Sequence, residues 1–282
     1  MHSSADWIHV LASFAAGGAW IAVVTLAADR LGSAWGGFLS GLPSTVLVAF
    51  LFIGLAQGPE AVVRATDVFL LAYAVTGLFL VVFAVFSRRR FWPGLGGALT
   101  VWFTLSALIS LLKPDNFALA GAIYAAVFLA GWAALTKGIR LPVSGHSPFR
   151  YSPGQVAGRA LFGGLMIALA VLASKAGGPL YGGIFAGFPA VFVSTLIIVH
   201  RSRGLSFARA MSAPMLVTGM ITIGIFGTAV RFFVPACGVA GGTVLAFLAA
   251  MVSALVPYVI FMKKHRPRAA DRRPWRGPAP LC

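Results

Sequence analysis

Two glycine-rich clusters, each ending in a proline, contain most of the residues in this sequence that could bind a ligand. The clusters read GGFLSGLP at residues 36–43 and GGIFAGFP at residues 182–189. Proline removes a backbone donor and glycine permits unwinding, so each cluster frees backbone groups inside an otherwise apolar run. We expect these clusters and the hydroxyl groups beside them to form a substrate path. The residues are Gly36, Gly37, Ser40, Gly41, Pro43, Ser44, Thr45, Gly182, Gly183, Gly187, Pro189, Ser194 and Thr195.

Acid–base, metal and redox chemistry have little support in the sequence. The carboxylates nearest the apolar runs lie at or near the ends of those runs, so a buried proton relay is poorly supported. They are Asp29, Glu60, Asp67 and Asp115. The histidines and cysteines near the runs show no metal-ligand or pairing pattern, and they are His9, His200, Cys237 and Cys282. With no nucleotide-binding loop or catalytic triad either, we predict a protein that is not an enzyme and has no cofactor and no metal site.

Composition indicates the class of protein that holds these clusters. The chain is 59% hydrophobic and 10% charged, with a mean hydropathy of +0.92. Such a sequence is too apolar for a soluble domain, and apolar runs of roughly 20 residues have the length of membrane-spanning helices. The fold class is therefore predicted as all-α, a polytopic integral membrane helix bundle. The first residues carry neither Lys nor Arg nor a small-residue cleavage site, so we expect the first helix to be retained.

Nine spans are predicted along the chain. One long apolar stretch is divided by the turn-forming residues 113–116, which makes the count odd. The predicted spans are residues 8–28, 35–57, 66–87, 92–112, 116–136, 159–175, 180–200, 209–230 and 238–262.

The distribution of basic residues agrees with nine spans, because short cytoplasmic loops accumulate Lys and Arg. With alternating loops, one side receives only Arg64, Lys113, Lys175 and Arg231. All other Lys and Arg residues fall on the opposite side, which we take as the cytoplasm. The N-terminus is then outside the membrane and the C-terminus in the cytoplasm. The net charge of +16 is explained by this asymmetry, so no nucleic acid is expected as a partner.

Membrane lipids are the expected partners of the basic residues. Arg201, Arg203 and Arg209 could bind a lipid phosphate, although topology alone also explains them. The Pro-rich tail, residues 263–282, is expected to be disordered and attracted to anionic headgroups.

The two clusters belong to a longer internal repeat. Residues 17–43 align without a gap to residues 163–189, and similarity continues more weakly through residues 61–65 and 206–210. Five helices separate equivalent points, so the second copy would enter the membrane from the opposite side. The predicted domains are a first four-helix repeat at 1–114, a linker transmembrane helix at 115–137, a cytoplasmic linker at 138–158, an inverted second repeat at 159–262 and the tail at 263–282.

The second half also resembles a known family. A small-residue helix ending in Ser174-Lys175, an aromatic-glycine stretch, the "FP" of Phe188-Pro189 and a loop ending in Ala-Arg-Ala at 208–210 are similar to the GlpM-like family of small bacterial inner-membrane proteins. The resemblance implies a four-helix unit that works as an antiparallel dimer, here fused into one chain. It also implies a link to exopolysaccharide production, without a defined substrate. The first half departs from the pattern, because Asp29 replaces the lysine and Leu42 the phenylalanine.

Glycine and proline interruptions at corresponding positions of inverted halves are typical of transporter midplane sites. The sequence therefore favours a small transporter or lipid-carrier translocator whose small-molecule or lipid-linked substrate is unknown. A channel on the same pseudo-two-fold axis and a non-transporting accessory of envelope exopolysaccharide machinery stay open as alternatives. The clusters are equally compatible with tight helix packing, for which small residues are the ordinary means.

Overall fold

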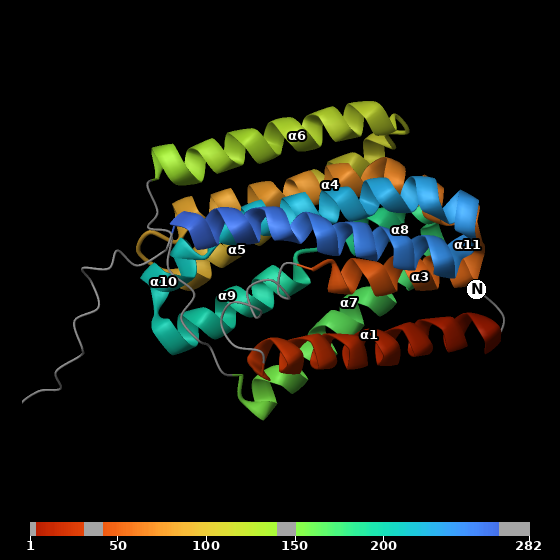
Figure 1. Ribbon diagram of the computed structural model, residues 1–282, viewed down its shortest axis with the longest axis horizontal. Helices are drawn as coiled ribbons and strands as arrows, with labels where there is room; N and C mark the ends of the chain where they lie inside the picture. Colours follow the sequence, from red (N-terminus) through yellow and green to blue (C-terminus); the bar gives the residue numbers. More distant parts are fainter. Residues whose placement is uncertain (1–3, 31–41, 140–150, 265–282) are drawn as a thin grey trace, which may run out of the picture.

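A computed structural model describes residues 4–30, 42–139 and 151–264, and every regular element in these ranges is helical. The all-α prediction is confirmed (Figure 1). The elements are α1 (Ser4–Arg30), α3 (Ser44–Gln57), α4 (Pro59–Phe86), α5 (Phe91–Leu112), α6 (Phe117–Ala133) with a π-helical turn η1 (Ala134–Gly138), α7 (Pro153–Gly177), α8 (Pro179–Ala186), α9 (Ala190–Arg203), α10 (Leu205–Ala210) and α11 (Ser212–Lys264).

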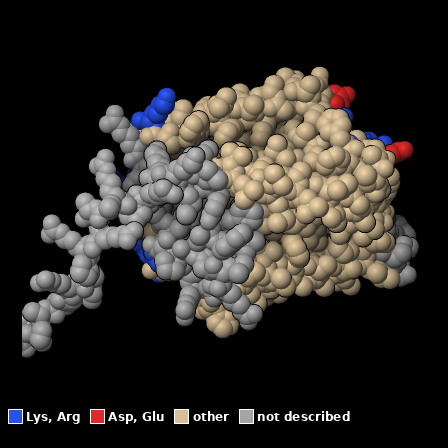
Figure 2. Space-filling view, viewed as in Figure 1, with Lys and Arg blue, Asp and Glu red and all other residues tan. Residues whose placement is uncertain are grey.

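The chain has the helices of a multi-pass membrane protein. In the described ranges, 7 helical stretches are long and apolar enough to cross a membrane, and the shorter apolar helix α3 adds to them. Figure 2 shows the charged side chains of this face at the two ends of the molecule, with an uncharged belt between them. This distribution is the one that a hydrocarbon core requires. The predicted count of nine spans and the orientation in the membrane stay predictions.

Helix α11 contains both of the last two predicted spans, because the chain turns back within it. Gly238 has a φ of 72° and a ψ of 172°, which no helix accommodates. Residues eight apart in a straight helix are separated by about 12 Å along its axis. Here, a Cβ atom on Gly242 would instead overlap the backbone of Val234. The two parts of α11 therefore pack against each other on either side of Gly238 (Figure 1).

Helix α4 is the central element of the bundle. It packs against α5, α6, α8 and α11, and its phenylalanines Phe69, Phe79 and Phe83 are fully buried. By contrast, α6 contacts mainly α4 and leaves most of its surface exposed. A helix that is apolar all round yet mostly exposed faces lipid in a membrane protein. The core is thus built around α4, with α6 at the periphery.

Helices α1 and α7 cross at their glycines through a set of reciprocal contacts. A Cβ atom on Gly17 would lie 2.5 Å from Cδ1 of Ile167, and one on Gly163 would overlap Cδ1 of Ile21. Each of these contacts pairs a glycine of one helix with an isoleucine of the other. Gly17 and Gly163 are aligned positions of the predicted sequence repeat, and so are Ile21 and Ile167. Small residues thus permit close approach of the two helices.

Side-chain contacts identify the two ends of the bundle. At one end, Arg231 of α11 forms an ion pair of 2.5 Å with Asp67, near the start of α4. At the other end, Arg209 Nε donates a hydrogen bond of 3.0 Å to the carbonyl of Ala84, near the end of α4. Helix α4 therefore spans the molecule. The turn that precedes α4 at Gly58 and the turn that precedes α10 lie at opposite ends.

Candidate functional site

The second glycine cluster interrupts a membrane span completely. Helix α8 ends at Ala186, and α9 begins only at Ala190. Pro189 has a φ of −77° and a ψ of 43°, and the amide of Ala190 donates to the carbonyl of Phe188 over 2.8 Å. This geometry is close to an inverse γ-turn. The sequence predicts one continuous span at 180–200, but the chain forms two separate short helices, because the turn at Pro189 ends the regular helical hydrogen bonding over residues 187–189.

Pro43 makes the same turn in the first half. Its φ is −74° and its ψ is 54°, and the amide of Ser44 donates to the carbonyl of Leu42 over 2.7 Å. Helices α3 and α9 both begin directly after these prolines and both contain 14 residues. Both end at a glycine with positive φ, which is 86° at Gly58 and 83° at Gly204. Figure 1 shows α3 and α9 starting near the middle of the molecule and running toward opposite ends.

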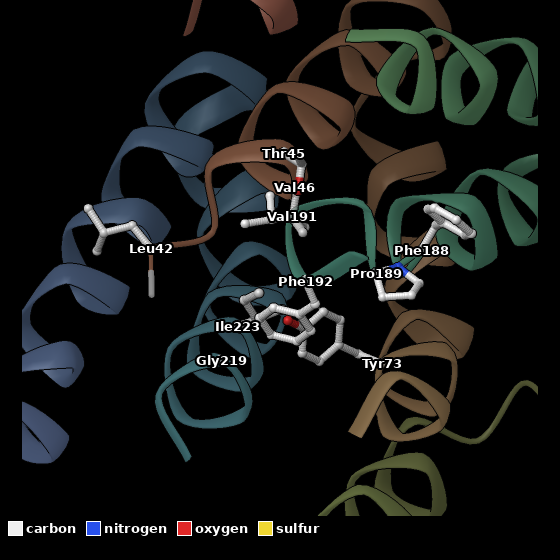
Figure 3. A pocket seen from close by; sticks show the side chains of 10 residues that line it. All are labelled: Leu42, Thr45, Val46, Tyr73, Phe188, Pro189, Val191, Phe192, Gly219 and Ile223. Carbon is white, nitrogen blue, oxygen red and sulfur yellow. The ribbon is translucent and has the colours of Figure 1, made fainter. Parts of the chain in front are cut away.

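A small cavity lies between the two proline turns (Figure 3). Its volume is about 20 Å³, which is room for one water molecule. The lining residues are Leu42, Thr45 and Val46 from the first turn and α3, Phe188, Pro189, Val191 and Phe192 from the second turn and α9, and Tyr73, Gly219 and Ile223 from α4 and α11. Leu42 and Phe188 are aligned in the predicted sequence repeat, and continuing that alignment without a gap pairs Thr45 with Val191 and Val46 with Phe192.

The cavity is largely apolar, with hydroxyl groups at its wall. Tyr73 extends from α4 toward Phe192, with which its ring packs at a centroid distance of 6.4 Å. Its hydroxyl oxygen lies among the lining side chains in Figure 3. A mostly apolar pocket with a few placed polar groups is the usual form of a small-molecule site.

A hydrogen-bonded pair from neighbouring helices stabilises the interruption of the α8–α9 span. The carbonyl of Gly187 accepts a hydrogen bond of 2.6 Å from the hydroxyl of Thr76 in α4. The indole Nε1 of Trp102 in α5 donates to the same hydroxyl oxygen over 2.9 Å. Both side chains are buried. A carbonyl that has left helical geometry inside a membrane needs such a partner, because no lipid can supply one.

The predicted substrate-path residues that the structure describes fall into three groups. Thr45 and Pro189 line the cavity, and Pro43 and Ser44 adjoin it at the start of α3. The glycines of α8 serve as close contacts with neighbouring helices: Gly182 with Ser174, Gly183 with Ala65 and Val68, and Gly187 with Ala72. The hydroxyls of Ser194 and Thr195 both donate to the carbonyl of Val191, over 3.0 and 2.7 Å. Gly36, Gly37, Ser40 and Gly41 lie outside the described residues.

The three predicted lipid-phosphate arginines differ in their surroundings. Arg201 and Arg203 are exposed, and the guanidinium of Arg203 lies 5.2 Å from the ring centre of Phe207. Arg209 is half-buried and donates to Ala84, so part of its hydrogen-bonding capacity is used within the bundle.

Sequence reasoning missed one charged residue in this region, Arg159. Its side chain is only 7% exposed, and its Nη1 donates a hydrogen bond of 2.7 Å to the hydroxyl of Thr195. The sequence prediction started this span at residue 159 and so read Arg159 as a loop charge. The capping box of Ser152 and Gln155 in fact begins α7 at Pro153, so Arg159 lies inside the helix. That S-x-x-Q pattern was the signal that could have found it.

In the described parts of the chain, no three His, Cys, Asp or Glu side chains are grouped as metal ligands would be. Residues 158–263 match the model of a family described as a protein of unknown function, DUF3147. The match runs from the second turn of α7 almost to the end of α11. No curated protein and no solved structure matches the chain.

Proposed function

We propose that this protein is a membrane transporter or lipid-carrier translocator whose substrate passes between two inverted halves. The observation that carries the proposal is the cavity between the turns at Pro43 and Pro189, because equivalent residues of both sequence repeats line it. In transporters with inverted repeats, substrates bind near the midplane at the ends of interrupted helices. The cavity has that position relative to α3 and α9.

Reciprocal packing supports the inverted relation of the halves. In a two-fold symmetric interface, residue i of one unit contacts residue j of the other, and j of the first contacts i of the second. The contacts of Gly17 with Ile167 and of Ile21 with Gly163 have this form. The turns at Gly58 and Gly204 are equivalent in the repeat and lie at opposite ends of the bundle. The peripheral helix α6 then supplies the extra crossing that turns the second half over.

The cavity volume of about 20 Å³ is too small for a solute or a lipid headgroup. A substrate larger than water would require the two halves to move apart on one side of the cavity. Helix α9 is separated from α8 by the non-helical turn at Pro189, and α3 begins at the non-helical turn at Pro43, so either helix can tilt at its turn. This arrangement favours alternating access over a permanently open channel.

The test uses purified full-length protein in liposomes and a matched pair of phenylalanine substitutions. Ile223→Phe enlarges a residue that lines the cavity and is 7% exposed. Ile225→Phe makes the same change on the same helix at a residue that is 44% exposed. Three activities are measured. They are translocation of a fluorescent phospholipid, detected by its accessibility to dithionite, counterflow of a panel of radiolabelled solutes, and ionic current. Thermal stability in detergent reports whether each variant is folded.

We expect lipid translocation or solute counterflow in wild type and in Ile225→Phe, and at least a tenfold loss in folded Ile223→Phe. A large passive current would replace the carrier with a channel. No flux in any arm would leave the accessory role, which rests on the GlpM-like resemblance. In that case, both variants should restore exopolysaccharide output to a deletion strain equally well.

A further inference from the structure

Arg159 is the one charged side chain in the described residues that is buried, with 7% exposed. Helix α7 begins at Pro153, so Arg159 lies about 9 Å along the helix axis at 1.5 Å per residue. Its hydrogen-bond partner Thr195 lies eight residues before the end of α9 at Arg203, which is about 12 Å from that end. The guanidinium is therefore held inside the bundle.

In the described part of the chain, no carboxylate compensates the charge of Arg159. The described residues contain an ion pair of Asp67 and Arg231 at the other end of α4, and no acidic group lies within ion-pair distance of Arg159. Its Nη1 donates to Thr195, its guanidinium lies 5.2 Å from the ring centre of Tyr151, and its buried Nε has no hydrogen-bond partner. A buried cation with an unused donor is costly unless something anionic binds it.

The architecture of the halves does not itself require this arginine. By the repeat alignment, the position of Arg159 corresponds to Ser13 in the first half, and that of Thr195 corresponds to Ala49. Ser13 is fully buried, and its hydroxyl donates to the carbonyl of Val10 within α1. The same crossing of α1 and α7 is thus formed with a small, locally satisfied residue in one half. Arg159 is an addition to one half.

We infer that Arg159, fixed by Thr195, is a binding site for an oxyanion. A guanidinium offers several donors in a planar fork that matches the oxygen atoms of a phosphate or carboxylate. The hydroxyl of Thr195 donates to the carbonyl of Val191, and Val191 lines the cavity. The site therefore lies one helical turn from the cavity, on its basic side. The oxyanion belongs either to a solute or to a lipid headgroup. Its role as substrate rests on the proposed function, whereas its binding does not.

The experiment measures binding, without any transport, in full-length protein. In the first arm, the protein is placed in phosphatidylcholine nanodiscs, and its unfolding temperature is followed while inorganic phosphate replaces chloride at constant ionic strength. In the second arm, native mass spectrometry counts phosphatidylglycerol retained from mixed micelles. The variants are Arg159→Gln, Arg159→Lys and Thr195→Val, with Arg201→Gln as the control at an exposed arginine of the same end.

A free oxyanion predicts that phosphate raises the unfolding temperature of wild type and Arg201→Gln, raises that of Arg159→Lys less, and leaves Arg159→Gln unchanged. A headgroup predicts no phosphate effect but at least tenfold less retained phosphatidylglycerol in Arg159→Gln than in Arg201→Gln. Thr195→Val should weaken whichever effect is found, because it frees the guanidinium to leave its position. Either pattern supports the site.

Stability without added anion supplies a second readout in case Arg159→Gln folds poorly. Arg159→Met removes the uncompensated charge and keeps an unbranched side chain, so it should unfold at the same temperature as wild type or higher. The inference is overturned if neither phosphate nor phosphatidylglycerol distinguishes wild type from the folded Arg159 variants, whatever the stability of Arg159→Met. That result would assign Arg159 to packing alone.

Discussion

The hydroxyl of Thr76 donates a hydrogen bond of 2.6 Å to the carbonyl of Gly187, in the break between α8 and α9. This contact joins residues 111 positions apart and supplies the partner that the interrupted span lacks. The central helix α4 thus supplies the hydrogen bond that stabilises the break between α8 and α9, although α4 does not itself contain the glycine cluster.

We expect Thr76→Val to destabilise the protein by about 1–3 kcal/mol, because the Gly187 carbonyl and the Trp102 indole both lose their partner in a buried site. Thr100→Val is the matched control, since the Thr100 hydroxyl is exposed and bonds only within its own helix. Thermal unfolding in detergent measures both variants. Equal stability of the two would mean that the break needs no support from α4.

Gly17→Leu and Gly163→Leu should destabilise the protein by similar amounts, about 1–3 kcal/mol each, because each overpacks one of two reciprocal contacts between α1 and α7. Gly96→Leu serves as control, because no atom lies near the added Cβ. The yield of monodisperse protein and its unfolding temperature are the readouts. A large effect at one glycine with none at the other would contradict a symmetric crossing.

Arg231→Gln should cost about 1–3 kcal/mol, because the guanidinium donates to Asp67 and to the hydroxyl of Thr66 in a partly buried site. Its guanidinium also lies 4.5 Å from the ring centre of Phe117 in α6. Arg64→Gln, at an exposed arginine in the same part of α4, should be nearly neutral. If the double charge exchange of Asp67 and Arg231 recovers no stability beyond either single change, the ion pair is not the stabilising interaction.

Single cysteines test the opposite placement of the Gly58 and Gly204 turns. In a background with Cys237 and Cys282 replaced by serine, Glu60→Cys and Ser206→Cys place thiols at exposed positions just after the two turns. A membrane-impermeant maleimide should label Glu60→Cys in intact cells and Ser206→Cys only after permeabilisation, as the basic-loop rule predicts. Labelling of both from one side would contradict the inverted arrangement.

Much of the fold was readable from local signals. Long apolar runs predicted helices, and Pro43 and Pro189 were identified as aligned positions of the predicted repeat, although each was placed inside a continuous span. The extent of α7 was missed because its capping residues, Ser152 and Gln155, lie in a loop-like sequence. A loop was predicted at 231–237 between the last two spans, whereas these residues are helical and the chain turns at Gly238.

The candidate site was readable only in part. Pro43 and Pro189 were identified because proline acts on its own backbone. Tyr73, Gly219 and Ile223 were not, since they line the cavity through long-range packing of α4 and α11. The glycines of α8 were assigned to the substrate path, whereas their closest contacts are with α4 and α7. A glycine that frees the backbone and a glycine that lets helices approach look identical in sequence.

Pro43→Ala and Pro189→Ala test whether the two turns do equivalent work. Alanine can adopt the backbone angles of either turn, but it restores a donor and permits a continuous helix. Its effect on stability should be no more than about 1 kcal/mol, chiefly through the unfolded chain. We therefore expect folded protein in which the interrupted span is straightened and any flux found in liposomes falls several-fold, by a similar factor in both variants.

The readout that needs no substrate is hydrogen–deuterium exchange of the peptides containing each turn. Exchange should slow after the alanine substitution, because amides at the turn gain helical partners. Pro59→Ala is the control, because it makes the same chemical change at the first residue of α4. An amide at that position has no helical acceptor in any case, so exchange and flux should stay at wild-type levels. If Pro43→Ala and Pro189→Ala leave exchange and flux as unchanged as Pro59→Ala does, the turns are packing features and the substrate path lies elsewhere. If exchange and flux change in only one of the two variants, the substrate path uses a single half of the protein. The position of Arg159 would then indicate the second half.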